Sequence, residues 1–309
     1  MLCDAHCHFF SSGFLEILTK DISGLPAANR AEVISAQLGW DPPGSAEALA
    51  DRWIAELNRH GIARAALIAS IPGDEESVAI AVARHPARFV GFFMFNPLAP
   101  DAHSRLARGL GEYKLRAVAL FPAMHGVRMD DEAVDETFRM AAAHDAAVFV
   151  HCGVLTVGIR KKLGLPSLFD LRLGDPLAVA RVALRHPSVS VIIPHFGAGF
   201  FREALMAADQ CPSLYLDTSS SNSWMKYYPG LTLEAVFRQA LAVVGPDRLL
   251  FGTDSSFFPR GWQQGIYDAQ QAALTAAGAS EEGRAKILGG NFGRLFRWEG
   301  AEGTEGTEI

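Results

Sequence analysis

Histidine and aspartate residues stand at the ends of separate apolar segments of this chain. The N-terminal segment contains His6 and His8, two positions apart, and three further polar residues each end an apolar run: His151, His195 and Asp254. Imidazole nitrogens and carboxylate oxygens are ligands of zinc, and also of iron, manganese and cobalt. Packing does not explain why polar residues repeatedly end apolar runs, so the set indicates a metal site.

The segments that must position these residues follow a repeating order. Apolar runs predict eight strands, near residues 2–8, 65–70, 88–95, 115–121, 146–151, 189–194, 213–218 and 248–253. Helical patterns lie between them, for example at 131–144 and at 232–244, where Thr232 is the expected N-cap. Continuous apolar strands that alternate with helices predict an α/β fold, a (β/α)8 TIM barrel.

All strands of such a barrel end on one face, where the active sites of this fold lie. Four residues are therefore expected to converge there, although they are far apart in the sequence: His8, His151, His195 and Asp254. Three imidazoles and one carboxylate suit a single divalent metal ion, and zinc is the expected ion.

The first strand is expected to present two different faces, because side chains alternate along a strand. One face should carry Asp4, His6 and His8. The other should carry Cys3, Ala5 and Cys7, with the Cys7 thiol pointing outward toward the helices as a small buried apolar group.

One domain is expected over residues 1–298. Residues 10–44 form an insertion after the first strand, and their position at the barrel mouth makes them a candidate lid or a contact in a homo-oligomer. Residues 299–309 are acidic, rich in glycine and low in complexity, so we expect a flexible tail.

The composition argues against several classes of protein. The net charge is −6 and the charges are spread along the chain, so nucleic acid is not an expected partner. The sequence contains neither an apolar run of about 18 residues nor a signal-peptide pattern, so no membrane association is expected. Four cysteines without C-x-x-C spacing predict free thiols, which favour the cytoplasm. The expected partner is a small-molecule substrate.

The ordered series of motifs resembles the amidohydrolase superfamily, in particular the amidohydrolase-related branch that includes aminocarboxymuconate semialdehyde decarboxylase and the resorcylate decarboxylases. The resemblance spans almost the whole chain, and the ordered series is far more specific than the H-x-H pair alone. It rests on Asp4-Ala5-His6-Cys7-His8, Val150-His151-Cys152-Gly153, Pro194-His195-Phe196-Gly197, Tyr215-Leu216-Asp217-Thr218-Ser219, Phe251-Gly252-Thr253-Asp254 and the closing helix at 287–296.

The resemblance implies a set of metal ligands: His6, His8, His151 and Asp254. His195 is then either a further ligand or the residue that holds the metal-bound water, and Asp217 and Ser219 are expected to support the ligands. Many relatives carry a carboxylated lysine in the fourth strand that bridges two metals. The corresponding position here is Ala119, so one metal ion is expected.

A divalent ion lowers the pKa of its bound water from 15.7 toward about 7. Asp254 is expected to take the proton from this water and deliver it to a leaving group, while His195 orients the hydroxide or polarises a carbonyl oxygen. The leading hypothesis is a metal-dependent hydrolase that cleaves a C–O or C–N bond of a small acidic or cyclic substrate. The alternative is a non-oxidative decarboxylase of an aromatic or dienoic acid. A non-catalytic metal-binding protein is a third hypothesis, which would require a closed ligand set.

Loops after the strands supply candidate substrate contacts. His125 follows the fourth strand and is either a contact or a surface histidine. Arg160 follows the fifth strand and either meets a substrate carboxylate or lies on a solvated helix face. Trp224 and Phe257 follow the seventh and eighth strands, where their rings suit an unsaturated substrate or packing beneath a lid.

Overall fold

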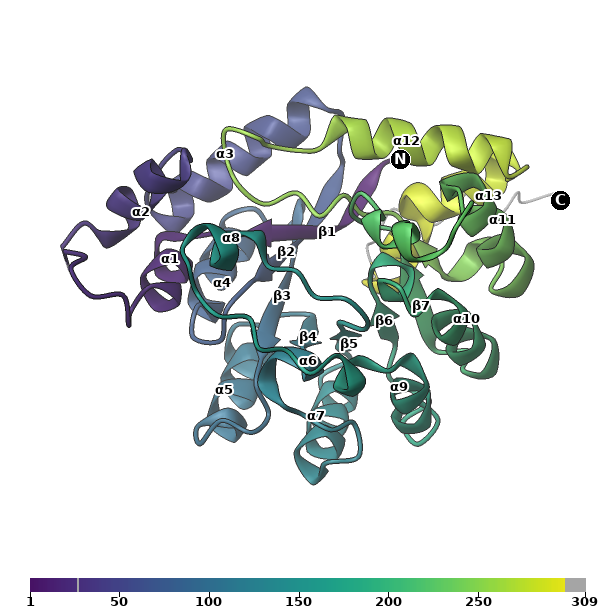
Figure 1. Cartoon of the computed structure of the whole chain (residues 1–309), viewed down its shortest axis with the longest axis horizontal. Coiled ribbons are helices and arrows are strands. Elements are labelled where there is room, and N and C mark those ends of the chain that lie inside the picture. Colours follow the sequence, from purple (N-terminus) through teal and green to yellow (C-terminus); the bar gives the residue numbers. More distant parts are fainter. Residues whose placement is uncertain (27, 298–309) are drawn as a thin grey trace, which may run out of the picture.

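The computed structural model describes residues 1–26 and 28–297, so the expected tail at 299–309 lies outside the described residues. Eight parallel strands lie side by side in chain order: β1 (Cys3–Phe9), β2 (Arg64–Ala69), β3 (Phe89–Phe95), β4 (Ala117–Leu120), β5 (Ala147–Val150), β6 (Val191–Ile193), β7 (Leu214–Asp217) and β8 (Leu249–Leu250). An isolated bridge joins Cys7 to Ser255, and the amide of Ala5 donates to the carbonyl of Phe251 at 2.8 Å. These bonds bring the last strand back to the first, which confirms the expected (β/α)8 barrel (Figure 1).

Helices surround the strands (Figure 1). They are α1 (Ser12–Leu18), α2 (Arg30–Leu38), α3 (Ala46–Arg59), α4 (Glu75–Arg84), α5 (Ala102–Ala107), α6 (Pro122–His125), α7 (Glu132–Ala143), α8 (Gly158–Lys162), α9 (Pro176–Ala183), α10 (Phe201–Gln210), α11 (Leu233–Val243), α12 (Gln264–Ala276), α13 (Glu281–Ala285) and α14 (Asn291–Leu295). The two helices predicted from the sequence correspond to α7 and α11. Thr232 caps α11 as expected, because its hydroxyl accepts a hydrogen bond from the amide of Ala235 at 3.2 Å. None of the described helices is long and apolar enough to cross a membrane.

The strands are buried on both faces, which explains their continuous apolar sequences. Inward-facing side chains form one cluster inside the barrel, which includes Ile68, Phe92 and Phe149. Outward-facing side chains form a larger cluster between the strands and the helices, which includes Phe93 and Phe138. Ala119 belongs to the inner cluster, so the fourth strand presents a methyl group to the barrel interior at this position.

The alternation along β1 differs from the prediction. Cys3 and Ala5 pack in the inner cluster, whereas Cys7 packs in the outer one, so these three residues do not share a face. Asp4 pairs with Ala65 of β2, and Cys7 pairs with Leu67. Three steps along β1 therefore match two steps along β2, which leaves one extra residue in β1. This irregularity exchanges the two faces after Ala5. It turns His6 and His8 inward.

A buried carboxylate lies where the faces of β1 exchange. The Asp4 oxygens accept hydrogen bonds from the amide of His6 (2.9 Å), the amide and hydroxyl of Thr253 (3.1 and 2.5 Å) and the indole of Trp262 (2.7 Å). Asp4 is fully buried and does not join the imidazoles at the site. Its bonds tie the irregular part of β1 to the segment that follows β8.

The insertion at 10–44 covers one side of the barrel mouth. Its helices α1 and α2 lie next to α8 in Figure 1. A third apolar cluster joins these helices, and it includes Phe14, Ile34, Trp40 and Ile159. The insertion therefore lies at the barrel mouth as predicted, while its role as a subunit contact stays a prediction.

Strands β6 and β8 are shorter than predicted from their apolar runs. The run expected to form a strand at 248–253 is a ladder strand only over Leu249–Leu250. Beyond it, the amide of Phe251 donates to the carbonyl of Ile287, and Thr253 bonds to Asp4. The chain stays buried there, but it no longer pairs with β7 beyond Leu250.

Replacing Asp4 with Ala should lower the free energy of unfolding by about 3 kcal/mol or more, because several buried donors would lose their acceptor. Urea unfolding followed by circular dichroism measures the change. Asp268→Ala on the exposed side of α12 is the matched control and should change stability by no more than about 0.5 kcal/mol. Equal stability of the two variants would show that the Asp4 network does not hold β1.

Candidate metal centre

Two imidazoles from β1 and one carboxylate from the loop after β8 meet at the barrel mouth. Asp254 Oδ1 lies 3.0 Å from His8 Nε2 and 3.7 Å from His6 Nε2. Ligand atoms of these three residues all lie within 4.8 Å of one another. The structure therefore brings together three of the four ligands that the resemblance implied.

Hydrogen bonding fixes the tautomer of His8. Ser70 Oγ lies 2.6 Å from His8 Nδ1 and 2.9 Å from the carbonyl of Ile68. A carbonyl only accepts, so both bonds form only if Ser70 donates to Ile68 and accepts from His8 Nδ1–H. When His8 is neutral, its Nε2 carries a lone pair that faces the Asp254 carboxylate at 3.0 Å, and when it is protonated the two groups form an ion pair. A metal ion can take the place of that proton, so this donor set fits a metal ion.

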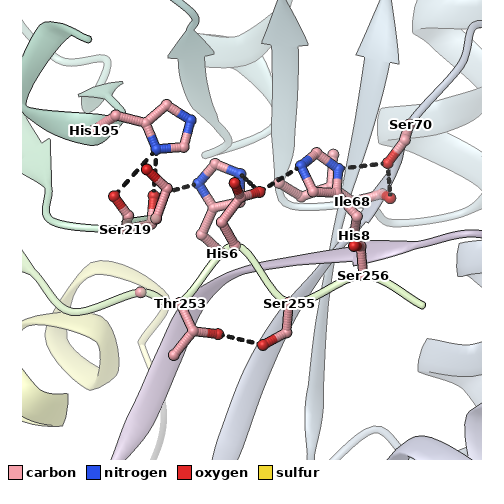
Figure 2. Close-up of polar contacts among 12 residues, drawn as sticks. His6, His8, Ile68, Ser70, His195, Ser219, Thr253, Ser255 and Ser256 are labelled. Atoms are coloured by element: carbon pink, nitrogen blue, oxygen red, sulfur yellow. Dashed lines mark hydrogen bonds and ion pairs between the residues drawn. The ribbon is translucent and has the colours of Figure 1, made fainter. Parts of the chain in front are cut away.

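His6 and His195 are oriented from the end of β7. Asp217 Oδ2 lies 2.6 Å from His6 Nδ1, and Ser219 Oγ lies 3.0 Å from His6 Nδ1 and 2.8 Å from His195 Nδ1. Figure 2 shows the three rings of His195, His6 and His8 in a row, with Ser219 beside the first two and Ser70 beyond the third. These contacts leave Nε2 of His6 and His195 for a cation, as neighbours of metal-binding histidines commonly do.

His151 is a further neighbour of His195, with 5.3 Å between the two ring centroids. It stacks on Phe121 and makes no side-chain hydrogen bond with the described residues, and its Nδ1 is buried. Its nitrogens do not belong to the compact group formed by His6, His8 and Asp254. Because His151 lines the cavity and its ring has no hydrogen-bond partner among the described residues, it fits the role of a fourth ligand.

The protonation states favour cation binding. Burial lowers the pKa of three imidazoles because it removes their charged form from water: His8, His151 and His195. Burial also acts to lower the pKa of His6, but the Asp217 carboxylate outweighs it and raises that pKa. Burial acts to raise the pKa of Asp254, whereas a hydrogen bond from His8 and the charges of protonated histidines hold it well below its usual range, so a metal ion would replace protons at these rings. Neutral imidazoles and an ionised carboxylate are the forms that bind metals.

The backbone is strained at two residues of the site. His195 has φ of 55° and Asp254 has φ of 62°, in the left-handed region that non-glycine residues rarely adopt. Each such residue costs about 1–2 kcal/mol, and such strain clusters at functional sites. At Asp254 a hydrogen bond holds this conformation, because its amide donates to the carbonyl of His6 at 2.9 Å.

A cavity of about 540 Å³ opens above the centre. Its walls include Trp224 and Phe257, two of the four predicted substrate contacts. The other two, His125 and Arg160, are not among the described residues that line it. The His125 imidazole lies near the backbone of Phe95, and burial lowers its pKa to about 4. Their roles as substrate contacts stay predictions without a place in the cavity wall.

Arg160 fails to reach the cavity because its guanidinium donates to the carbonyl of Pro166 in its own loop. Lys162 lines the cavity instead, as does Arg260 from the loop after β8. Sequence analysis did not single out Ser70, the partner of His8. Ser70 carried the same signal as His151, since it directly follows an apolar strand.

Comparison with known proteins agrees with the barrel fold. A family model described as Amidohydrolase matches residues 3–298, while a search of curated proteins finds no match. Solved structures of the same fold include an uncharacterized TIM-barrel protein from Bordetella bronchiseptica (21% identity, 96% of this chain and 98% of that chain covered, TM-score 0.64). Others are 5-carboxyvanillate decarboxylase from Novosphingobium aromaticivorans with bound manganese (16%, 96% and 97%, 0.64) and a probable 2-pyrone-4,6-dicarboxylic acid hydrolase from Acinetobacter baumannii with citric acid bound (15%, 96% and 99%, 0.57).

Replacing His6 with Ala should remove bound metal, because the variant loses a ligand between Asp217 and Asp254. We expect substoichiometric zinc after dialysis, measured by inductively coupled plasma mass spectrometry. His103→Ala on the surface is the matched control and should retain the wild-type content. Affinity of the wild type should fall as the pH is lowered, because protons compete for the imidazoles. Stoichiometric zinc in the His6 variant would show that the ligands lie elsewhere.

Proposed function

Because this chain belongs to the amidohydrolase family, we propose that it is a metal-dependent hydrolase that cleaves a C–O or C–N bond of a small acidic or cyclic substrate. The observation that carries the proposal is the close approach of His8 Nε2 and Asp254 Oδ1, two metal-binding groups 3.0 Å apart in the wall of an open cavity. His6, His8 and Asp254 would hold the ion, with His151 and His195 as further donors. A bound divalent cation supplies a water that loses its proton near neutral pH.

Asp254 is the residue best placed to move that proton. Its carboxylate is ionised and is 33% exposed, so a water molecule in the cavity can reach it. It can accept the proton from the attacking water and later deliver it to the leaving group. The backbone amide of Asp254 donates to the carbonyl of His6 at 2.9 Å. This bond limits how far the Asp254 carboxylate can move.

His195 has a different role. Its Nδ1 contacts the hydroxyl of Ser219 at 2.8 Å and the carbonyl of the same residue at 3.3 Å, and a carbonyl only accepts. The proton therefore lies on Nδ1, and Nε2 is a bare nitrogen in the cavity wall. In this form His195 orients the attacking water by accepting a hydrogen bond from it, or contributes one more donor to the ion.

A specific observation also favours the second candidate, a non-oxidative decarboxylase. Four rings form a column of near-parallel planes along one wall: Phe14 on Phe10, Phe10 on Trp40, and Trp40 on Phe257. Flat apolar walls suit flat substrates. One solved structure of the same fold is a 5-carboxyvanillate decarboxylase and another is a probable pyrone dicarboxylic acid hydrolase. Both reactions are therefore compatible with this barrel.

Asp254→Asn should retain the fold and lower turnover by about 100-fold to 10,000-fold, because an amide cannot accept the proton. The measurement is the steady-state rate of the zinc-loaded variant on the best substrate of the wild type. Asp209→Asn, on the exposed side of α10, is the matched control and should keep the full rate. A wild-type rate in the Asp254 variant would remove this carboxylate from the reaction.

The two candidate reactions give different products. Zinc-loaded wild type should hydrolyse members of a panel of lactones and cyclic amides, with product formation followed by chromatography. The same protein should release no CO2 from hydroxybenzoates. CO2 release without hydrolysis of any lactone or amide would reverse the order of the two candidates.

A further inference from the structure

The charges around the cavity are unbalanced. Among the described residues that line it, Asp254 is the sole acid, and the ion at the centre would use its charge. Three basic side chains line the same cavity: Lys162, Lys226 and Arg260. Lys226 lies with its ammonium 5.1 Å from the ring of Tyr227 and is exposed. An excess of positive charge around a concave site favours an anionic ligand.

Arg260 differs from the two lysines because it is held in place. Its Nη2 donates to the carbonyl of Asp254 at 3.3 Å and to the hydroxyl of Ser256 at 2.6 Å. Its guanidinium carbon lies 4.5 Å from the centroid of the Phe257 ring, which itself stacks on Trp40. A guanidinium fixed on one face and at one nitrogen is pre-organised, so little conformational entropy remains to be lost when it binds a ligand.

Arg260 forms no close ion pair within the described part of the chain, although the charge of Asp254 acts on its guanidinium from farther away. No described carboxylate lies within 4.0 Å of its guanidinium. A guanidinium has five N–H donors, and the two on Nη2 are used, so the three on Nε and Nη1 have no protein acceptor there and are open to solvent or a ligand, because Arg260 is exposed. Arg52 offers a contrast, since it stacks on Phe258 with 4.0 Å to the ring centroid but forms an ion pair with Asp41. Arg260 has the same kind of aromatic support without the acid.

From these contacts we propose that Arg260 binds an anionic group of the substrate, such as a carboxylate, and so determines specificity for acidic substrates. The proposal rests on the proposed function, because it takes the cavity above the metal centre as the substrate site. The anion lies beside the same loop that carries Asp254. Binding through Arg260 therefore fixes the substrate relative to the carboxylate that moves the proton, while the ring of Phe257 supports the guanidinium.

The test compares two probes of the same shape, benzoate and benzamide, on the full-length zinc-loaded protein. Isothermal titration calorimetry gives the ratio of their dissociation constants for wild type, Arg260→Gln and Arg260→Lys. We expect wild type to prefer benzoate, and Arg260→Gln to reduce that preference by at least about tenfold, as expected for loss of a charge-assisted hydrogen bond. Arg260→Lys should recover part of the preference. Arg172→Gln, an exposed arginine that pairs with Asp170, is the matched control and should keep the wild-type ratio.

A wild-type ratio in Arg260→Gln would overturn the proposal, as would equal binding of benzoate and benzamide by the wild type. Should Arg260→Gln fail to fold, Arg260→Lys decides the matter, because it keeps the charge and most of the side chain. A ratio of dissociation constants between the wild-type value and unity supports the assignment. An unchanged ratio contradicts it. Binding needs no turnover. Failure of hydrolysis and of CO2 release would therefore defeat the proposed function separately from this result.

Discussion

The site depends on the exchange of faces within β1. With regular alternation, a strand that turns Cys3 and Ala5 into the barrel would turn His6 and His8 out toward the helices. One extra residue corrects this, and the buried carboxylate of Asp4 holds the extra residue by accepting bonds from both β1 and the segment after β8. The same carboxylate therefore holds the backbone that carries the two imidazoles and joins β1 to the segment after β8.

Burial and hydrogen bonding then act together on the chemistry of the centre. Burial keeps most of the imidazoles neutral, and neighbours such as Asp217 and Ser70 each occupy Nδ1 of one ring. The Nε2 atoms of His6 and His8 lie 3.7 and 3.0 Å from one ionised carboxylate, Asp254. Without an ion, protons on these rings offset the charge of the carboxylate. Under the proposed function, a divalent ion would take the place of those protons.

The loop after β8 joins the candidate metal centre to the cavity. It supplies Asp254 to the centre, Phe257 to the aromatic wall and Arg260 to the mouth. The ring of Phe257 also stacks on Trp40, so the insertion after β1 packs directly against the loop that carries the acid. A movement of the insertion at 10–44 would therefore shift the loop that carries Asp254, because the stacked rings of Trp40 and Phe257 join the two segments.

The sequence by itself determined the eight strands, the barrel and the candidate metal-binding residues at the strand ends, because apolar runs ending in polar residues are local patterns. Only the tertiary structure decided which way β1 faces, since the extra residue becomes visible only when Asp4 and Cys7 are paired with β2. It also decided that Arg260 and not Arg160 reaches the cavity. Both arginines follow a strand, and their different roles depend on which acceptors the folded loops place beside each guanidinium.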